Sequence, residues 1–119
     1  MPAGQQVEID LKSMPYAITN LLRNAFKYAS TRISVDAELA GENMLIHVDD
    51  DGIGIPEQER QRVFFAFTRL DRSRDRSTGG YGLGLAIARR VLELHGGTAT
   101  ADASPLGGAR FTLTWKARQ

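Results

Sequence analysis

The chain has 119 residues, 42% of them hydrophobic and 24% charged, a composition typical of one soluble globular domain with a single core. It contains no cysteine, which excludes disulfides and thiolate metal sites and suits a reducing compartment. The net charge of +1 gives no general attraction to nucleic acid or anionic lipid, and no apolar run reaches the length of a membrane span.

The first predicted elements are a short strand and a helix. Residues 7–11 alternate between apolar and charged side chains, which indicates a half-buried strand. Pro15 suits the first turn of a helix that begins near Ser13 or Met14. Apolar residues then recur at helical spacing and predict the side of this helix that faces the core: Ile18, Leu21, Leu22, Ala25, Phe26 and Ala29.

A second side of this helix, roughly opposite the first, has an unusual composition: Asn20, Asn24, Lys27 and Tyr28. Asparagine lowers helix propensity because its amide competes for backbone hydrogen bonds, so two asparagines one turn apart need a reason. One interpretation is a pair of tolerated surface amides. The other is a pair of neutral oxygen ligands for a hard cation such as Mg²⁺, with the lysine one turn on contacting the phosphates that the ion bridges.

A hairpin follows, in which residues 33–39 and 44–48 alternate in polarity around a polar turn. Its second strand leads into Asp49-Asp50-Asp51-Gly52-Ile53-Gly54. Three consecutive carboxylates repel one another, so this stretch is either a polar turn or a turn with one carboxylate directed inward. An inward carboxylate could accept a hydrogen bond from an exocyclic amine, and the glycines would let a flat ring lie against the backbone.

Residues 57–63 predict a short helix after Pro56. Residues 69–81 are rich in arginine and lack a clean period, which is typical of a lid or binding loop. Three phenylalanines would anchor its start: Phe64, Phe65 and Phe67. An arginine-rich segment could also suit RNA, but two interleaved aspartates argue against that interpretation, and we expect no nucleic acid partner.

Residues 79–85 form a glycine-rich stretch that runs directly into an amphipathic helix ending near His95. It is not a P-loop, because Leu85 and Ala86 stand where lysine and a hydroxyl are required, and no buried strand precedes it as in a dinucleotide fingerprint. It is either a phosphate cradle at a helix start or a flexible turn. The predicted core-facing residues of the helix are Leu83, Ala86, Ile87, Val91 and Leu94.

Two last strands are predicted at residues 98–103 and 109–115, with Phe111, Leu113 and Trp115 on one face. The order of these elements predicts an α/β (α+β) two-layer sandwich, in which a mixed five-stranded sheet carries about three helices on one face. With only His47 as a companion, His95 is a helix-end residue and forms no metal cluster.

Four stretches in this order resemble the nucleotide-binding motifs of sensor histidine kinases: residues 20–28, 51–54, 64–67 and 79–85. Their order and spacing are similar to the catalytic ATP-binding domain of that family, which shares the Bergerat fold and a mobile ATP lid with gyrase, Hsp90 and MutL. The resemblance covers nearly the whole chain. Residues 69–80 look especially like proteobacterial kinases of the EnvZ/RstB kind.

The resemblance implies a role for each matching residue. Asn24, helped by Asn20, would hold Mg²⁺. The adenine pocket would consist of five residues: Tyr28, Asp51, Gly52, Gly54 and Ile55. In it, Tyr28 would pack on the ring and Asp51 would accept a hydrogen bond from the exocyclic amine.

The resemblance also implies a lid over the triphosphate that contains Gly80, Gly82, Leu83 and Gly84. Positive charge near the phosphates would come from Lys27 and, at the γ-phosphate, from Arg69 or Arg74. Ala66 stands where a proline is common in the third motif, which leaves the details of lid anchoring open.

One position separates two chemistries in the superfamily that this chain resembles. Its hydrolytic members carry a glutamate one helical turn before the metal-binding asparagine, and Asn20 occupies that position here. An amide cannot act as a general base, so hydrolysis of ATP is expected to be slow. The resemblance thus implies that the domain binds Mg-ATP and donates the γ-phosphoryl group to a histidine on a separate dimerisation domain.

Residues 1–119 are therefore expected to form one catalytic domain, without the phosphoacceptor domain. The expected partners are ATP and ADP, the phosphoacceptor domain of the same kinase and, indirectly, a response regulator. The fragment is expected to be monomeric and cytoplasmic, and the full-length kinase dimeric and in the bacterial inner membrane. The alternatives are an ATPase of the same superfamily, an anti-sigma serine kinase and a non-catalytic nucleotide-sensing module.

Overall fold

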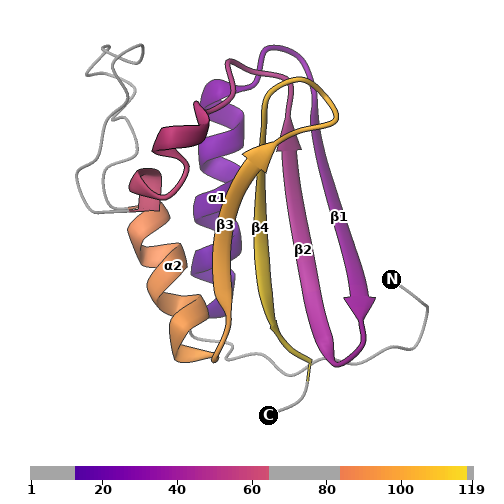
Figure 1. Cartoon of the computed structure of the whole chain (residues 1–119), viewed down its shortest axis with the longest axis vertical. Helices are drawn as coiled ribbons and strands as arrows, with labels where there is room; N and C mark the ends of the chain where they lie inside the picture. The colour runs from indigo at the N-terminus through magenta and orange to yellow at the C-terminus, as the bar shows by residue number, and fades with distance from the viewer. Residues whose placement is uncertain (1–12, 65–83, 118–119) are drawn as a thin grey trace.

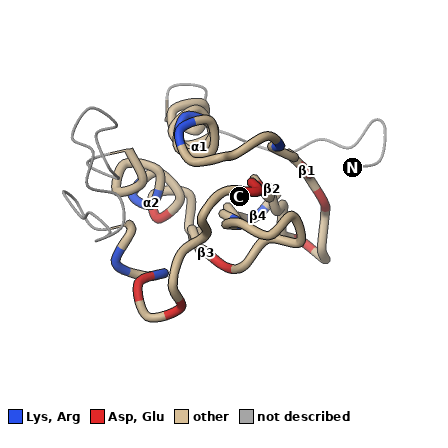
Figure 2. The backbone as a smooth tube through the Cα atoms, turned by 90° about the horizontal axis from the view of Figure 1, so that it is seen from above, with Lys and Arg blue, Asp and Glu red and all other residues tan. Residues whose placement is uncertain are grey.

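The structure is a computed structural model, which describes residues 13–64 and 84–117. Two helices, α1 (Met14–Tyr28) and α2 (Gly84–Leu94), lie side by side on one face of a sheet (Figures 1 and 2). The strands of this sheet are β1 (Ile33–Ala40), β2 (Asn43–Asp50), β3 (Thr98–Ala103) and β4 (Ala109–Lys116). The two-layer α/β class predicted from the sequence is confirmed.

The strand order is β1-β2-β4-β3, and all three pairings in this sheet are antiparallel. The prediction of a mixed five-stranded sheet is therefore corrected for the described residues to four antiparallel strands. The additional strand predicted at residues 7–11 lies outside the described residues. The short helix predicted after Pro56 consists of two 3-10 turns, η1 (Glu57–Glu59) and η2 (Arg62–Phe64).

The core lies between the sheet and the two helices. From β4 the side chains of Phe111, Leu113 and Trp115 point into it, as the alternation predicted. Residues opposite them on β2, including Met44 and Val48, share that face because the antiparallel register aligns them.

The core-facing side of α1 differs from the one that the sequence predicts. Phe26 is 75% exposed, whereas Met14, Ala17, Leu21 and Ala25 are fully buried. The small alanines let the helix approach its neighbours closely, and α1 is rotated so that Asn24, expected on the opposite side, is only 9% exposed.

A similar correction applies to α2. Ile87 and Leu94 were predicted in the core but are exposed, and the buried residues are Leu85, Ala88, Val91 and Leu92. The helix ends as predicted: Gly96 has a positive φ of 72°, and the Gly97 N–H donates to the Leu92 carbonyl at 2.7 Å. Within the described ranges, neither helix has the length and apolar character needed to cross a bilayer.

Candidate functional site

Asn20 and Asn24 lie on the flank of α1 that borders α2. Asn24 is buried and Asn20 is half-buried. Neither side chain forms a hydrogen bond with another of the described residues. The backbone of Gly84 lies beside Asn20, because a Cβ at position 84 would be 3.9 Å from Asn20 Oδ1. The first residue of α2 and the amide flank of α1 therefore border the same space.

The chemistry of this space suits a metal-bound anion. Amide oxygens are ligands that hard cations accept, and the first turn of α2 has backbone N–H groups without helical partners, which favour a negatively charged group. Lys27, one turn after Asn24, is exposed. Several residues predicted around the phosphates lie outside the described residues: Arg69, Arg74, Gly80, Gly82 and Leu83.

The three consecutive aspartates have three different environments. The first of them, Asp49, forms an ion pair with a neighbouring strand of the sheet. Its carboxylate accepts two hydrogen bonds from Arg110, from Nε at 2.8 Å and from Nη2 at 3.1 Å. This bidentate pair joins β2 to β4 across the register and raises the pKa of the Arg110 guanidinium above its ordinary value. Asp49 is therefore a structural partner of Arg110.

Asp51, the predicted adenine acceptor, binds the loop that follows α1. Its carboxylate accepts hydrogen bonds from Ser30 N–H at 2.8 Å, Thr31 N–H at 3.0 Å and the Thr31 hydroxyl at 2.6 Å. The Thr31 hydroxyl, followed by backbone N–H groups, holds the pKa of Asp51 well below its ordinary value. The Asp51 carboxylate thus fixes the connection between α1 and β1.

Asp50 is the carboxylate directed inward, at 1% exposure. Its Oδ1 accepts hydrogen bonds from Gly52 N–H at 2.9 Å and Ala109 N–H at 3.1 Å, and its carbonyl accepts from Gly108 N–H at 3.1 Å. Within the described part of the chain, no donor bonds Oδ2. Strict alternation from the buried Val48 through β2 would have pointed to Asp50 from the sequence.

Glycines bring these segments into close contact. A Cβ at Gly52 would overlap the Tyr28 carbonyl, and a Cβ at Gly108 would overlap Asp50 Oδ1. Gly54 has a positive φ of 71° and lies against the Gly108 backbone. The turn after β2 is therefore packed between the end of α1 and the β3–β4 connection. Gly108 lies in none of the sequence motifs.

Two apolar residues support this turn and the segment after it. Ile55 is buried in the core. Phe64 packs edge-on against Phe111 of β4, with ring centroids 6.0 Å apart and an interplanar angle of 87°. Phe64 thus anchors the chain where the sequence predicted an anchor, whereas the other two phenylalanines lie outside the described residues.

The described residues hold no group of three or more His, Cys, Asp or Glu side chains that could bind a metal ion. A metal between α1 and α2 would take its protein ligands from the amides, and its other ligands from phosphate oxygens and water. The nearly buried Asn24, whose amide is free of described hydrogen-bond partners, fits this role.

Residues 9–119 match the family described as "Histidine kinase-, DNA gyrase B-, and HSP90-like ATPase". The chain therefore belongs to this ATPase family. Its relatives include the sensor protein RstB of Escherichia coli (strain K12), 44% identical over 112 residues that cover 94% of this chain and 26% of RstB. They also include the sensor histidine kinase WalK of Bacillus subtilis (strain 168), 40% identical over 119 residues that cover 95% of this chain and 20% of WalK. The resemblance to sensor histidine kinases is confirmed.

Solved structures agree with this placement. The mycobacterial sensor histidine kinase MprB has a TM-score of 0.83 and 32% identity, covering 94% of this chain and 77% of that one. The ATP binding domain of PrrB from Mycobacterium tuberculosis has a TM-score of 0.77 and 32% identity, covering all of this chain and 78% of that one. The chain spans about a quarter of RstB and a fifth of WalK, so it corresponds to the ATPase part of longer sensor kinases.

Proposed function

We propose that this chain binds Mg-ATP between α1, α2 and the turn after β2, and donates the γ-phosphoryl group to a histidine of a separate phosphoacceptor domain. The observation that carries the proposal is the position of Asn24. Its amide is almost buried, makes no side-chain hydrogen bond with the described residues, and lies one helical turn before Tyr28, against whose carbonyl the turn after β2 is packed.

Asp50, rather than Asp51, is the adenine acceptor in this proposal. Asp51 already accepts three hydrogen bonds from the loop after α1, whereas Asp50 has one carboxylate oxygen that no described residue bonds. A buried carboxylate held by two backbone N–H groups is well oriented to accept from an exocyclic amine. Tyr28 and Gly54 border the same turn and would contact the ring, with Gly52 and Ile55 supporting it.

Asn24 and Asn20 would supply the protein ligands of Mg²⁺. When bound, the ion would supply positive charge that neutralises the charge developing on the phosphate oxygens during transfer. The first-turn N–H groups of α2 at Gly84 would bind phosphate oxygens from the side of Asn20. Lys27 would add positive charge one turn beyond Asn24, and Arg69 and Arg74 remain proposed for the same role.

Transfer to a protein nucleophile, rather than hydrolysis, follows from the chemistry of Asn20. Its amide cannot take a proton from water, so it cannot act as a general base for hydrolysis. The domain would therefore contribute positioning and electrostatic stabilisation, and the nucleophile would come from another domain.

The wider setting of this chemistry is also part of the proposal. Residues 1–119 would form one catalytic domain that is monomeric by itself, and the longer kinase would be dimeric. The phosphorylated histidine would pass its phosphoryl group to a response regulator. The catalytic domain would lie in the cytoplasm and the longer protein in the bacterial inner membrane, as expected for a sensor protein of the RstB type.

The test compares the parent chain with Asn24→Ala and with Asn43→Ala, an exposed asparagine at the start of β2. Titration with a fluorescent ATP analogue, with Mg²⁺ and with excess EDTA, should show Mg-dependent binding for the parent and Asn43→Ala and its loss for Asn24→Ala. Undiminished Mg-dependent binding by Asn24→Ala would refute the metal assignment.

Phosphoryl transfer is tested separately with radiolabelled ATP and the histidine-bearing domain of a related kinase. The expected product is an acid-labile phosphoryl group on that domain, with little free phosphate from the catalytic domain alone. Acid-stable label would indicate a serine kinase. Steady phosphate release would indicate an ATPase, and nucleotide binding without label would indicate a sensing module.

A further inference from the structure

The strand β3 is an edge of the described sheet, because its only partner there is β4. The Ser104 N–H donates to the Gly108 carbonyl at 2.9 Å. Hydrogen-bonded positions alternate along an antiparallel ladder, so the backbone groups of Thr98, Thr100 and Asp102 point toward β4. The N–H and C=O groups of Ala99 and Ala101 then point away from the sheet.

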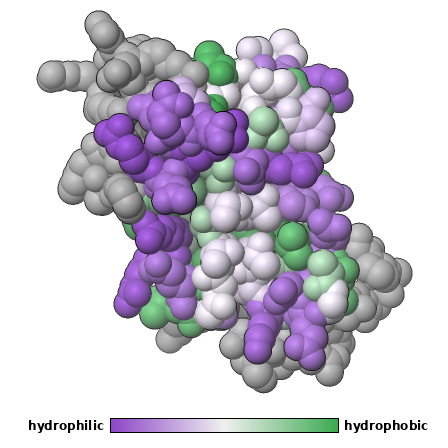
Figure 3. All heavy atoms as spheres, viewed as in Figure 1, coloured by the Kyte–Doolittle hydropathy of each residue, from purple (hydrophilic) through white to green (hydrophobic). Residues whose placement is uncertain are grey.

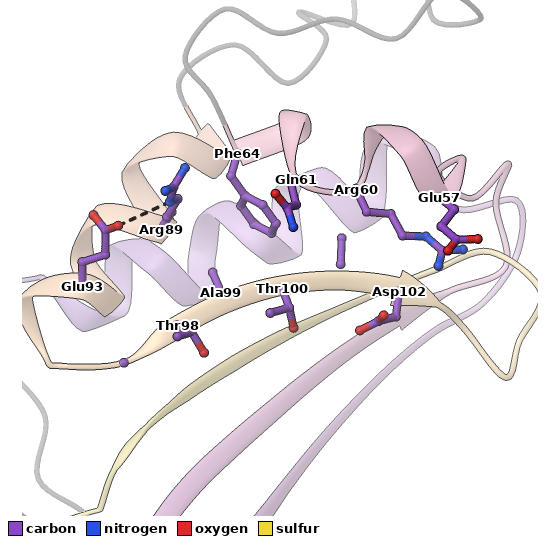
Figure 4. Close-up of a pocket in the computed structure, with 12 residues that line it drawn as sticks. Glu57, Arg60, Gln61, Phe64, Arg89, Glu93, Thr98, Ala99, Thr100 and Asp102 are labelled. Atoms are coloured by element: carbon purple, nitrogen blue, oxygen red, sulfur yellow. Dashed lines mark ion pairs between the residues drawn. The ribbon is translucent and has the colours of Figure 1, made fainter.

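A groove of about 710 Å³ runs along this edge (Figure 4). One wall is β3 from Thr98 to Asp102, and the other comes from η1, η2 and α2. The close-up shows Phe64 and Gln61 directed toward the strand and the short side chain of Ala99 on the facing wall. The groove exists because alanines at positions 99 and 101 do not fill the space under the helical elements. None of its lining residues belongs to the proposed nucleotide site.

This edge lacks two of the features that usually prevent strands from pairing with other chains. Lysine and proline are the common protective residues on edge strands, and Thr98–Ala103 contains neither. Its single charge is Asp102, whereas β1 carries both Asp36 and Glu38. The surface over β3 is accordingly pale between strongly hydrophilic neighbours in Figure 3.

The charges of the groove favour a basic partner at one end. Asp102 is exposed, and among the described residues neither it nor Glu57 has an ion-pair partner. Both lie at the same end of the groove in Figure 4. Arg60, at that end, donates its Nε–H to the Ile55 carbonyl at 3.2 Å. At the opposite end, Arg89 and Glu93 form an ion pair at 3.4 Å.

We propose that this groove binds an extended segment of a partner protein, which adds a strand to β3. Its backbone would pair with Ala99 and Ala101, and every second side chain would enter the groove beside Phe64. A lysine or arginine would stand opposite Asp102. The wall of five strand residues accommodates a segment of about 17 Å, at about 3.4 Å per residue.

The groove geometry selects a single segment rather than a second copy of this domain. A strand that lies between a sheet edge and a neighbouring helix is the arrangement by which peptides are recognised through strand addition. Here η1, η2 and α2 stand along the edge of β3, and the groove between them and the strand has a volume of about 710 Å³. The proposal does not depend on nucleotide binding.

The probes are capped peptides that alternate threonine and valine and carry one lysine: Thr-Val-Thr-Val-Lys and the reverse sequence Lys-Val-Thr-Val-Thr, one for each strand direction. Counterparts carry glutamate in place of lysine. Binding is followed by NMR, through the amide shifts and hydrogen exchange of Ala99 and Ala101. We expect one lysine peptide to slow exchange at both amides and to bind about twofold to fivefold more tightly than its glutamate counterpart, as for a cross-strand ion pair.

Two variants test the contacts. Asp102→Lys should reverse the preference between lysine and glutamate peptides, whereas Asp36→Lys, the same change at an exposed residue of β1, should leave the preference unchanged. Ala99→Pro removes an outward N–H without removing a bond to β4, and should abolish peptide binding. The melting temperature and ATP binding of each variant confirm that the fold is retained.

Three results would overturn the proposal. The first is an absence of protection at Ala99 and Ala101 with every peptide at millimolar concentration. The second is equal binding of lysine and glutamate peptides by both the parent and Asp102→Lys. The third is protection that depends on protein concentration without peptide, since a second copy of the domain would then occupy the edge.

Discussion

The backbone of Gly84 lies against the side chain of Asn20, such that a Cβ at position 84 would be 3.9 Å from Asn20 Oδ1. This contact joins the start of α2 to the amide flank of α1. The separation is an ordinary van der Waals distance, so one added methyl group fits and a branched side chain would press on Asn20. The size of the side chain at position 84 should therefore determine how much room is left beside Asn20 for the proposed magnesium ion and phosphates.

Gly84→Ala should bind Mg-ATP nearly as well as the parent, and its free energy of unfolding should be unchanged or higher by up to about 1 kcal/mol, since alanine favours helix. Gly84→Val should weaken Mg-ATP binding by about tenfold, because its additional methyl groups crowd Asn20. Calorimetric titration and thermal unfolding measure both effects. Equal binding by the alanine and valine variants would contradict the placement of phosphate beside Asn20.

Asp50→Asn should mainly reduce the affinity for ATP, whereas Asp51→Asn should mainly reduce the stability of the fold. Loss of a hydrogen bond to a charged group costs about 1.5–3 kcal/mol, so Asp50→Asn should weaken ATP binding by about tenfold or more. Asp51→Asn should lower the melting temperature, because Asp51 holds Ser30 and Thr31, and should leave the affinity for ATP close to that of the parent. If Asp51→Asn alone lost ATP binding, Asp51 would be the adenine acceptor.

Gly52→Ala should damage both stability and nucleotide binding. Its methyl group would overlap the Tyr28 carbonyl, and such overpacking costs about 1–3 kcal/mol. Gly41→Ala is the matched control, since Gly41 has a φ of 62° and open space around it. The control should lose about 1 kcal/mol from backbone strain and retain ATP affinity. Chemical denaturation and nucleotide titration separate these outcomes.

The lowered pKa of Asp51 predicts a pH-dependent contribution to stability. Because the folded pKa lies below the unfolded one, the unfolded chain binds more protons and stability rises with pH in this range. The contribution is complete above the ordinary aspartate pKa of about 3.9 and is lost as the pH falls below it. The stability difference between the parent and Asp51→Asn should therefore be the same at about pH 6 and about pH 5, and smaller at about pH 3.

Urea unfolding at several pH values measures this difference. Asp36→Asn, which removes an exposed carboxylate on β1, reports the effect of deleting one surface charge. A pH-independent gap between the parent and Asp51→Asn would contradict the role given to the Thr31 hydroxyl.

The sequence predicted much of this fold because its strands alternate clearly. The observed β3 has the predicted bounds, and the chain reversal at Gly41 lies where the polar turn was expected. Family resemblance added the proposed nucleotide site, which no single motif would have supported. Local periodicity and the spacing of four motifs were sufficient to predict the class of fold.

The rotation of the helices could not be predicted from periodicity alone. Both helices carry apolar residues on more than one side, so Phe26 and Ile87 fit a core stripe as well as the alanines that are buried instead. Which stripe faces the sheet depends on how closely the helices approach, and this is a property of the packed structure. For the same reason, the burial of Asn24 could not be predicted from the sequence.

The choice among the three aspartates depended on contacts between distant segments. The structural role of Asp49 comes from its hydrogen bonds with Arg110, and that of Asp51 from its hydrogen bonds with Thr31. Both partners are distant in the sequence. The alternation of β2 places Asp50 on the same buried face as Val48. The argument from repulsion between neighbouring carboxylates, by contrast, did not show which of the three aspartates is directed inward.

The close contact between Gly108 and Asp50 should restrict which residues can occupy position 108. The β3–β4 turn has no recognised motif, yet its backbone supports the carboxylate proposed to read the base. In a saturation mutagenesis screen scored on signalling output, residue 108 should tolerate as few replacements as the motif glycines.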